Sequence, residues 1–364
     1  GLMFWTFLAA HAVEKPNVII VIADDMGFFD TGYNGNKILK TPVLNEMAAK
    51  GILFDYFYAA GKLCCPGRFA ILTGRAPMRG GLNGNEKIRP NEITIAKMLK
   101  QAGYRTGYFG KWHLGRRETS PVGMGFQQAI WIMNQYNVNP EFEIQDTKEI
   151  LSLKGDGSVA VVDLGIKFIR EQAKNGQPFL VTLGFASPHE PYLPAPEFFA
   201  LYKDQPKAVA VFAGEITGMD TAVGKLRQEL RRLGIADNTM LWFISDNGGI
   251  QMSSKDPAGR GKGKIGTRTI GLLEWPARVP EPRRLNVPCG HIDIYPTILD
   301  AIGQQPPELP IIDGISLLPV LDGKVNTRSK PLPFFLLDYG STSYMRVDFV
   351  KDSQGIWIDG SYEL

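Results

Sequence analysis

The chain has 364 residues, of which 44% are hydrophobic and 21% are charged, and its formal net charge is +3. These values are typical of a globular protein, and the length suffices for one large domain or for a domain with a smaller companion. The basic residues are spread along the chain without a basic block, which argues against a nucleic-acid-binding protein and favours at most a small anionic substrate.

The first segment, residues 1–12, is apolar and ends in the small-x-small pattern Ala10-His11-Ala12. This pattern is typical of a signal peptide, and the segment is too short to span a bilayer as a helix. We therefore expect residues 1–12 to be the remnant of a signal peptide. The protein would then be exported, to a periplasm, the cell exterior or a lysosome-like compartment, without stable membrane insertion.

Short apolar runs alternate with helical patterns over residues 13–305, which predicts an α/β domain with a large, mostly parallel sheet between helices. The expected strands are 17–23, 104–109, 179–185, 239–245 and 270–274. The clearest helix covers 211–233, where apolar residues recur at spacings of four and three and Gly234 follows as a C-cap. A shorter helix is expected over 92–102, and another over 294–302.

The last part of the chain has a different composition. Residues 306–332 are rich in Pro, Gly and Asp, which is typical of a linker. Residues 333–364 have the pattern of short strands separated by turns. We expect them to form part of a small antiparallel subdomain.

Residues capable of chemistry follow four of the expected strands. They are, in chain order, Asp24 with Asp25, Lys111 with His113, His189, and Asp246 with Asn247. Ligands of open α/β sheets bind beyond the carboxyl ends of the strands, so parallel strands would bring all four groups to one rim. The carboxylates and the amide offer only oxygen ligands, which select calcium or magnesium over zinc. Each pair alone is more typical of a turn or a helix cap, but the cysteine motif described next favours a metal site.

The chain has three cysteines, too few for a disulfide framework, and Cys64 and Cys65 are adjacent. Pro66 fits the first turn of a helix, which would place Cys64 just ahead of a helix N-terminus, where exposed N–H groups favour an anion. Arg68 would lie about one turn further on and could pair with that anion. A buried cysteine pair that caps a helix explains the pattern equally well. We interpret Cys65 and Cys289 as packing cysteines.

The segment Cys64-x-Pro66-x-Arg68 followed by Leu72-Thr73-Gly74-Arg75 resembles the signature of the type I sulfatases, in which the cysteine is oxidised to formylglycine. Further matches follow in the expected order: Pro16-Asn17-Val18 before Asp24-Asp25, Gly110-Lys111-Trp112-His113-Leu114-Gly115, Ser187-Pro188-His189 and Ser245-Asp246-Asn247-Gly248. The resemblance covers nearly the whole chain, from Lys15 onwards. It implies an alkaline phosphatase-like α/β fold whose small C-terminal subdomain is truncated, because family members continue beyond Leu364.

The resemblance also implies a ligand set and site residues. One calcium ion would be held by the formylglycine at position 64 together with Asp24, Asp25, Asp246 and Asn247. Arg68, Lys111 and His113 correspond to residues around the formylglycine, and His189 corresponds to the histidine near the leaving group. A further lysine contacts the sulfate in the family. Lys262 is the candidate and Lys264 the alternative, because the stretch before Arg268 is shorter than usual.

The activity implied is hydrolysis of a sulfate ester, with a sulfated small molecule or glycan as substrate and a formylglycine-generating enzyme as partner during maturation. His189 would be the general acid and His113 the base that releases sulfate. The remaining histidine of the mature chain, His291, is interpreted as structural or capping. Three alternatives stay open: a phosphonate or phosphate ester hydrolase of the same superfamily, a non-catalytic protein that binds sulfated glycans, and a redox or thiolate-metal role for the cysteine pair.

Overall fold

A computed structural model describes residues 15–82, 84, 86–134, 137–249, 267–337, 344–350 and 357–363, with side chains up to residue 333. The expected signal peptide and both candidate sulfate-contacting lysines, Lys262 and Lys264, lie outside the described residues. Within the described part of the chain, none of the helices combines the length and the apolar character that crossing a membrane requires.

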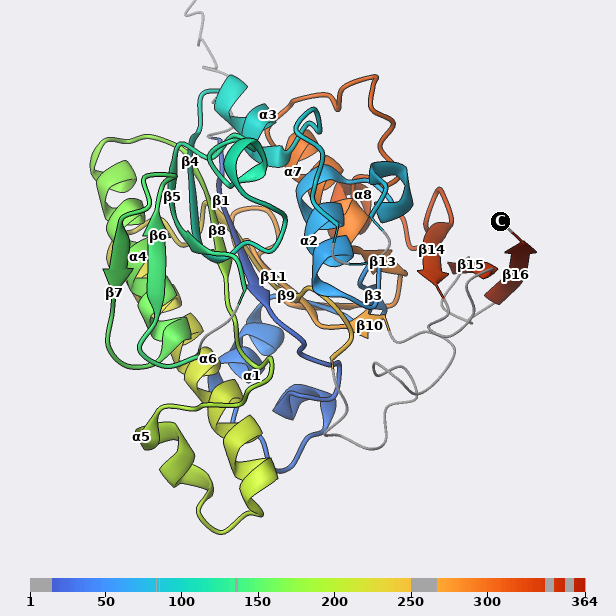
Figure 1. The fold of residues 1–364 in the computed structure, drawn as a ribbon. Coiled ribbons are helices and arrows are strands. Elements are labelled where there is room, and N and C mark those ends of the chain that lie inside the picture. The colour runs from blue at the N-terminus through green and yellow to red at the C-terminus, as the bar shows by residue number, and fades with distance from the viewer. Residues whose placement is uncertain are drawn as a thin grey trace, which may run out of the picture.

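A ten-stranded sheet forms the centre of the molecule, in the order β12-β2-β11-β9-β1-β8-β4-β5-β6-β7 (Figure 1). The middle of the sheet is parallel and consists of β9 (Thr239–Ser245), β1 (Asn17–Ala23), β8 (Phe179–Gly184), β4 (Arg105–Lys111) and β5 (Gln128–Ile132). Antiparallel pairs flank it and involve β11 (Gly271–Glu274), β2 (Ile52–Phe54), β6 (Glu141–Ile144) and β7 (Ile150–Ser152), while β12 (Arg283–Leu285) pairs parallel with β2. The predicted α/β fold with a mostly parallel sheet is confirmed.

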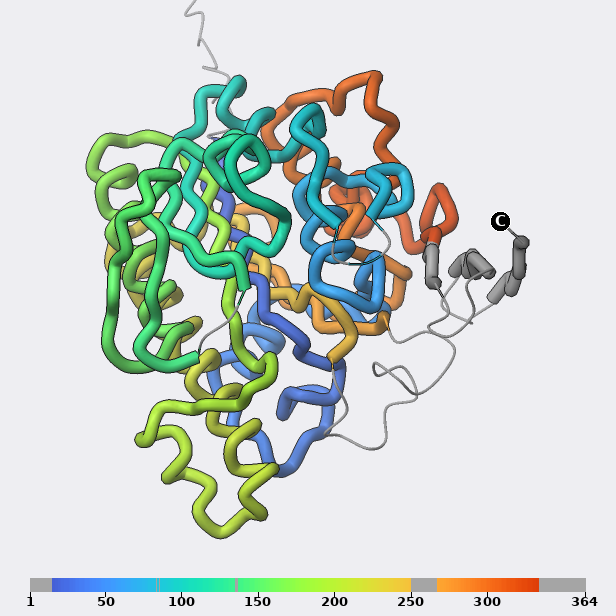
Figure 2. The backbone as a smooth tube through the Cα atoms, in the orientation of Figure 1, coloured from blue at the N-terminus to red at the C-terminus, as the bar shows by residue number. Residues whose placement is uncertain are grey.

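Helices cover both faces of this sheet, which explains why β1, β8 and β9 are buried along nearly their whole length without alternation. On β1, Val18, Ile20 and Ile22 pack with α2 (Cys64–Thr73), α3 (Ile95–Gln101), α7 (His291–Ala301) and α8 (Leu318–Leu321). Ile19 and Val21 face α1 (Pro42–Lys50), α4 (Gly157–Lys174) and α6 (Lys207–Arg232) on the opposite side. Figure 2 shows the chain path, with the green segments that carry β5–β7 and α4 on the left and the orange segments that carry α7 and α8 on the right.

The helices differ from their predicted bounds at the N-terminal ends. α6 begins four residues before the predicted 211, because its first turn is mostly exposed and so lacks the apolar stripe. α3 begins later than predicted, since the Thr94 side chain accepts a hydrogen bond from the Lys97 amide and caps the helix there. α7 begins at His291, three residues earlier than predicted, where Asp293 accepts a hydrogen bond from the Gly290 amide.

Two smaller sheets complete the described structure. One consists of β10 (Arg268–Thr269), β3 (Phe57–Tyr58) and β13 (Cys289–Gly290). The other is antiparallel and consists of β14 (Leu332–Leu337), β15 (Tyr344–Val350) and β16 (Trp357–Glu363), in the region expected to form a small subdomain. Within the segment expected to be a linker, Leu317, Leu318 and Leu321 at α8 are buried in the core beside α7.

Candidate active site

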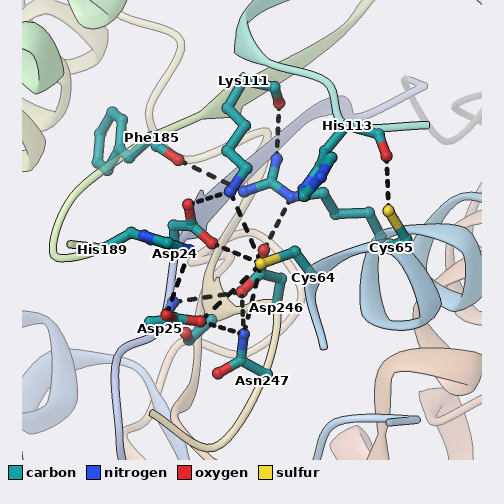
Figure 3. Close-up of polar contacts among 12 residues, drawn as sticks. Asp24, Asp25, Cys64, Cys65, Lys111, His113, Phe185, His189, Asp246 and Asn247 are labelled. Carbon is teal, nitrogen blue, oxygen red and sulfur yellow. Dashed lines mark hydrogen bonds and ion pairs between the residues drawn. The ribbon is translucent and has the colours of Figure 1, made fainter. Parts of the chain in front are cut away.

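The carboxyl ends of β1, β8, β4 and β9 meet at one edge of the sheet, and the polar residues that follow them lie together there (Figure 3). Backbone hydrogen bonds extend the parallel pairing beyond the strands. The Asp24 amide donates to the Ser187 carbonyl at 3.0 Å, and the Asp246 amide donates to the Ala23 carbonyl at 3.0 Å. The ends of these strands are therefore held in register where the side chains emerge.

Cys64 lies at the centre of this group. It is the first residue of α2. The helix therefore begins at Cys64 itself, whereas the position of Pro66 predicted that Cys64 lies just ahead of the helix. Its Sγ atom lies 3.0 Å from Asp24 Oδ1 and 3.9 Å from Asp25 Oδ1. Every residue of α2 is buried, which fixes the position of its N-terminus.

The surroundings of Cys64 disfavour a thiolate. Burial and the neighbouring carboxylates of Asp24 and Asp246 raise the pKa of the Cys64 thiol well above its usual value, although Lys111 and Arg68 oppose them. These effects outweigh the preference for an anion at the helix N-terminus. A thiol held neutral in this way is a poor nucleophile and a poor ligand for a soft metal, which disfavours the redox and thiolate-metal alternatives.

Arg68, which could pair with an anion at position 64, forms an ion pair with Asp246. Its Nε atom donates to Asp246 Oδ2 at 2.8 Å, and both side chains are buried. Its Nη1 atom donates to the Lys111 carbonyl at 2.6 Å. Arg68 thus links α2 to the ends of β9 and β4 through two hydrogen bonds. One buried guanidinium can satisfy several acceptors in this way.

Lys111 and Asp24 form a fully buried ion pair beside Cys64. Lys111 Nζ also lies 3.6 Å from Cys64 Sγ. Burial alone would raise the pKa of Asp24, but Lys111 and Arg68 lower it below its usual range. Burial opposes the charge of Lys111, yet Asp24 and Cys64 raise its pKa. Lys111 is therefore a permanent cation that faces the position of any group attached to residue 64.

His113 lies two residues beyond Lys111. Burial, together with Lys111 and Arg68, lowers the pKa of His113 to about 4, so its ring is neutral near pH 7. Its Nδ1 atom is buried and has no hydrogen-bond partner among the described residues. Its carbonyl accepts a hydrogen bond from Cys65 Sγ at 2.8 Å, so Cys65 also holds the backbone of His113 in place.

His189 approaches the site from the segment that follows β8. Its Nδ1 atom lies 2.7 Å from the Glu190 carbonyl, and its Nε2 atom lies 3.6 Å from Asp25 Oδ2. Because a carbonyl only accepts, Nδ1 carries the proton of the neutral ring and Nε2 is the nitrogen that faces the site. Burial lowers the pKa of His189.

Four side chains of this site could hold a metal ion together. The ligand atoms of Asp24, Asp25, Cys64 and His189 lie within 4.8 Å of one another. Asn247 joins this group, since its Nδ2 atom lies 2.6 Å from Asp25 Oδ1, and a half-turn of the amide would present an oxygen there instead.

The charges of the site suit a bound cation. Asp24, Asp25 and Asp246 are buried, and within the described part of the chain Lys111 pairs with Asp24 and Arg68 pairs with Asp246. Burial and the nearby Asp24 raise the pKa of Asp246, which shows that the carboxylates compete for the available positive charge. Because an uncompensated buried charge is costly, a divalent cation with a preference for oxygen ligands fits this donor set.

His291, which was expected to be structural, supports the site from α7. It is fully buried, and its Nε2 atom lies 2.8 Å from the carbonyl of Ser245, the residue before Asp246. Its Nδ1 atom accepts a hydrogen bond from the Ala60 amide at 3.4 Å. Burial lowers the pKa of His291 to about 3, so its ring stays neutral and keeps both contacts.

Two buried residues near His189 were missed in the sequence. Glu215 of α6 accepts hydrogen bonds from the Ser187 hydroxyl and, at 2.7 Å, from the Leu193 amide. Asn137 Nδ2 donates to the His189 carbonyl at 3.2 Å and to the Pro191 carbonyl at 3.0 Å. For Glu215 a signal was present, since it is a charged residue on the apolar stripe of α6, beside Ile216. Nothing in the surroundings of Asn137 in the sequence distinguishes it.

Replacing Glu215 with glutamine should make the stability of the protein less dependent on pH. Burial, together with Asp156, raises the pKa of Glu215 from 4.5 to about 7, although Ser187 and Leu193 donate to it. A carboxyl group whose pKa rises on folding contributes stability below its unfolded pKa, and that contribution is lost as the pH rises through the folded value.

The measurement is the melting temperature at about pH 5 and about pH 8. Wild type should lose more stability between these two values than Glu215→Gln, because the amide carries no charge at either pH. Equal losses in the two proteins would show that Glu215 does not ionise differently in the folded and unfolded chains.

Comparison with known families and proteins gives a consistent result. The family model described as Sulfatase matches residues 16–304. The N-acetylgalactosamine-6-sulfatase of Canis lupus familiaris is 30% identical over 357 residues, which cover 86% of this chain and 67% of that protein. The steryl-sulfatase of Homo sapiens is 27% identical in an alignment of 427 residues, gaps included. The alignment covers 87% of this chain and 72% of that protein.

Solved structures share the fold. The crystal structure of Ps i-CgsB in complex with k-i-k-neocarrahexaose has a TM-score of 0.85 and 25% identity, and covers 95% of this chain and 86% of that one. A second protein, solved in complex with its substrate D-glucosamine-2-N,6-O-disulfate, has a TM-score of 0.80 at 20% identity, and the match covers 96% of this chain and 91% of that one. The second match shows the fold alone.

Proposed function

This chain belongs to the sulfatase family, and from that premise we propose that it hydrolyses a sulfate ester of a carbohydrate through a formylglycine formed from Cys64. Two observations on relatives support the carbohydrate part. One similar relative is an N-acetylgalactosamine-6-sulfatase, and one similar structure holds a neocarrahexaose.

The position of Cys64 is the observation that carries the proposal. The buried thiol lies 3.0 Å from Asp24 Oδ1 and 3.6 Å from Lys111 Nζ, among hard oxygen ligands and a permanent cation. This environment suits an oxygen nucleophile far better than a neutral thiol. Oxidation of Cys64 to an aldehyde by a formylglycine-generating enzyme would replace Sγ with oxygen at this place. Once hydrated, the aldehyde offers two hydroxyl groups: one attacks sulfur, and the second expels sulfate as the carbonyl re-forms.

One calcium ion is the proposed metal. Asp24, Asp25, Asp246 and Asn247 would hold it together with an oxygen at position 64, and when bound it would favour the ionised form of the attacking hydroxyl group. His189 lies close to the same carboxylates. We assign it to the leaving group and not to the metal, because its side chain is 23% exposed whereas that of Asp25 is 1% exposed, so a departing alcohol can reach it from solvent.

The side chains around residue 64 supply the charge and the protons. Lys111 neutralises charge that develops on the sulfuryl oxygens, and its fixed ion pair with Asp24 means that it needs no rearrangement to do so. Arg68 orients Asp246 and the end of β4. His189, in the doubly protonated form that the charge of Asp24 favours, gives its Nε2 proton to the departing alcohol. His113, neutral near pH 7, accepts the proton of the second hydroxyl group. Lys262, with Lys264 as the alternative, remains the proposed sulfate contact.

Hydrolysis of a phosphate or phosphonate ester is the second candidate, because a formylglycine, a cation and Lys111 would suit either group. We test the two with matched 4-nitrophenyl sulfate and 4-nitrophenyl phosphate, using protein made in a host that forms formylglycine. The proposal predicts a higher kcat/KM for the sulfate ester. A higher kcat/KM for the phosphate ester would contradict it, and binding of sulfated sugars without any hydrolysis would favour the non-catalytic alternative.

A further inference from the structure

The segment that carries His189, residues 187–193, is held by buried side chains at every second residue. We call this segment the His189 loop. Glu215 accepts from the Ser187 hydroxyl at its start and from the Leu193 amide at its end. Asn137 donates to the carbonyls of His189 and Pro191 between them. The loop thus has a fixed path although it contains no helix or strand.

Of the two side chains that hold the loop, Glu215 and Asn137, Glu215 binds it at both ends. Its side chain is 0% exposed and belongs to α6, which is 26 residues long and packs against α4, α5 (Pro196–Phe199) and α1. Its two carboxylate oxygens bind opposite ends of the loop, so any shift of the loop would have to break a buried hydrogen bond. Leaving a buried donor unsatisfied is costly, and this cost holds the loop in one arrangement.

The loop is also continuous with the site. The Ser187 carbonyl accepts from the Asp24 amide at 3.0 Å, so one residue of the loop contacts both Glu215 and the backbone of Asp24. His189 itself has Nδ1 against the Glu190 carbonyl, within the loop, and Nε2 directed at the site. The path of the loop backbone therefore helps to set the position of Nε2, beside its contact with Asp25.

We propose that Glu215 is a positioning residue that fixes the His189 loop so that His189 Nε2 reaches the oxygen of the leaving alcohol. This inference rests on the proposed function of His189 as general acid. Protonation matters most for alcohols that leave poorly as anions and least for those that leave well. Glu215 therefore determines how steeply hydrolysis slows as the leaving group becomes more basic.

The test uses a series of substituted phenyl sulfates, from 4-nitrophenyl sulfate to unsubstituted phenyl sulfate, and measures kcat/KM against the pKa of the phenol. For Glu215→Ala we expect little change with 4-nitrophenyl sulfate and a loss of about tenfold to a hundredfold with phenyl sulfate. The dependence on leaving-group pKa becomes steeper, which general loss of stability would not produce.

Glu215→Gln is the conservative variant. Its amide oxygen can accept from the Leu193 amide, and its NH₂ group can donate to the Ser187 hydroxyl oxygen, so both ends of the loop stay bound. We expect the leaving-group dependence of wild type. Ser187→Ala removes one of the two hydrogen bonds between Glu215 and the loop and should give an intermediate leaving-group dependence. This variant tests the positioning role of Glu215 if Glu215→Ala does not fold.

Asp220 offers a matched control on the same helix. It is buried and accepts from the Val43 and Leu44 amides at 3.1 and 2.8 Å, so Asp220→Ala also loses two backbone contacts, but at α1. Its leaving-group dependence should equal that of wild type. Equal losses across the whole series in Glu215→Ala, or a steeper dependence in Asp220→Ala as well, would overturn the inference. If matured wild type hydrolysed none of the esters, the proposed function would fail instead, and the inference with it.

Discussion

Replacing Cys64 with alanine should abolish hydrolysis of sulfate esters, with a fall in kcat of roughly four to six orders of magnitude, as expected when a nucleophile is removed. Alanine cannot be converted to an aldehyde, so no hydroxyl group stands between Asp24 and Lys111. The fold should survive, because Cys64 is one small residue at the start of a wholly buried helix. The measurement is kcat for 4-nitrophenyl sulfate, with circular dichroism as the check on folding.

Cys65 provides the matched control for this experiment. It is adjacent, buried and also a thiol, but its Sγ atom contacts the His113 carbonyl and lies outside the proposed ligand set. Cys65→Ser keeps a donor for that carbonyl, so its kcat should stay within about tenfold of wild type. Retention of activity in Cys64→Ala, or an equal loss in both variants, would refute the proposed nucleophile.

Replacing His113 with alanine should trap the enzyme with sulfate attached to residue 64. Burial and two neighbouring cations hold the pKa of His113 at about 4, so the ring is ready to accept a proton at neutral pH. Without it, the alcohol still departs but the second hydroxyl group keeps its proton, and turnover slows by roughly a hundredfold to ten-thousandfold. Intact-protein mass spectrometry after mixing with substrate should show the adduct, together with a burst of released alcohol.

The double variant Cys64→Ala/His113→Ala controls for sulfate bound elsewhere, since it should show neither burst nor adduct. Arg68 and Lys111 are unchanged in both proteins, so the surrounding charges are the same. Normal steady turnover of His113→Ala with no adduct would exclude His113 as the base.

The parallel strands and the rim on which they end could be predicted because both depend on local sequence. Residues 18–23 are continuously apolar and are followed at once by two carboxylates, and the structure has β1 over Asn17–Ala23. Residues 240–244 are likewise apolar, and Asp246 follows shortly after them, at the end of β9. A strand buried on both faces needs this pattern, and its end is visible as an abrupt change to polar residues.

The partners of the site residues could not be predicted, because they are far apart in the sequence. Arg68 pairs with Asp246 across 178 residues, and the relation between them depends on how α2 packs beside β9. The raised pKa of Cys64 follows from burial and from the carboxylates of Asp24 and Asp246, which come just after β1 and β9 and are distant from Cys64 in the sequence. Glu215 and Asn137 were missed because their partners are mostly backbone groups of a loop.

The central claim is that residue 64 is an aldehyde in the active protein. The most direct measurement is the mass of the tryptic peptide that covers residues 63–68, taken from a preparation that hydrolyses sulfate esters. The account predicts formylglycine at position 64 and an unmodified thiol at Cys65. An unmodified thiol at both positions in an active preparation would contradict it, because the proposed attack on sulfur needs a hydroxyl group at position 64.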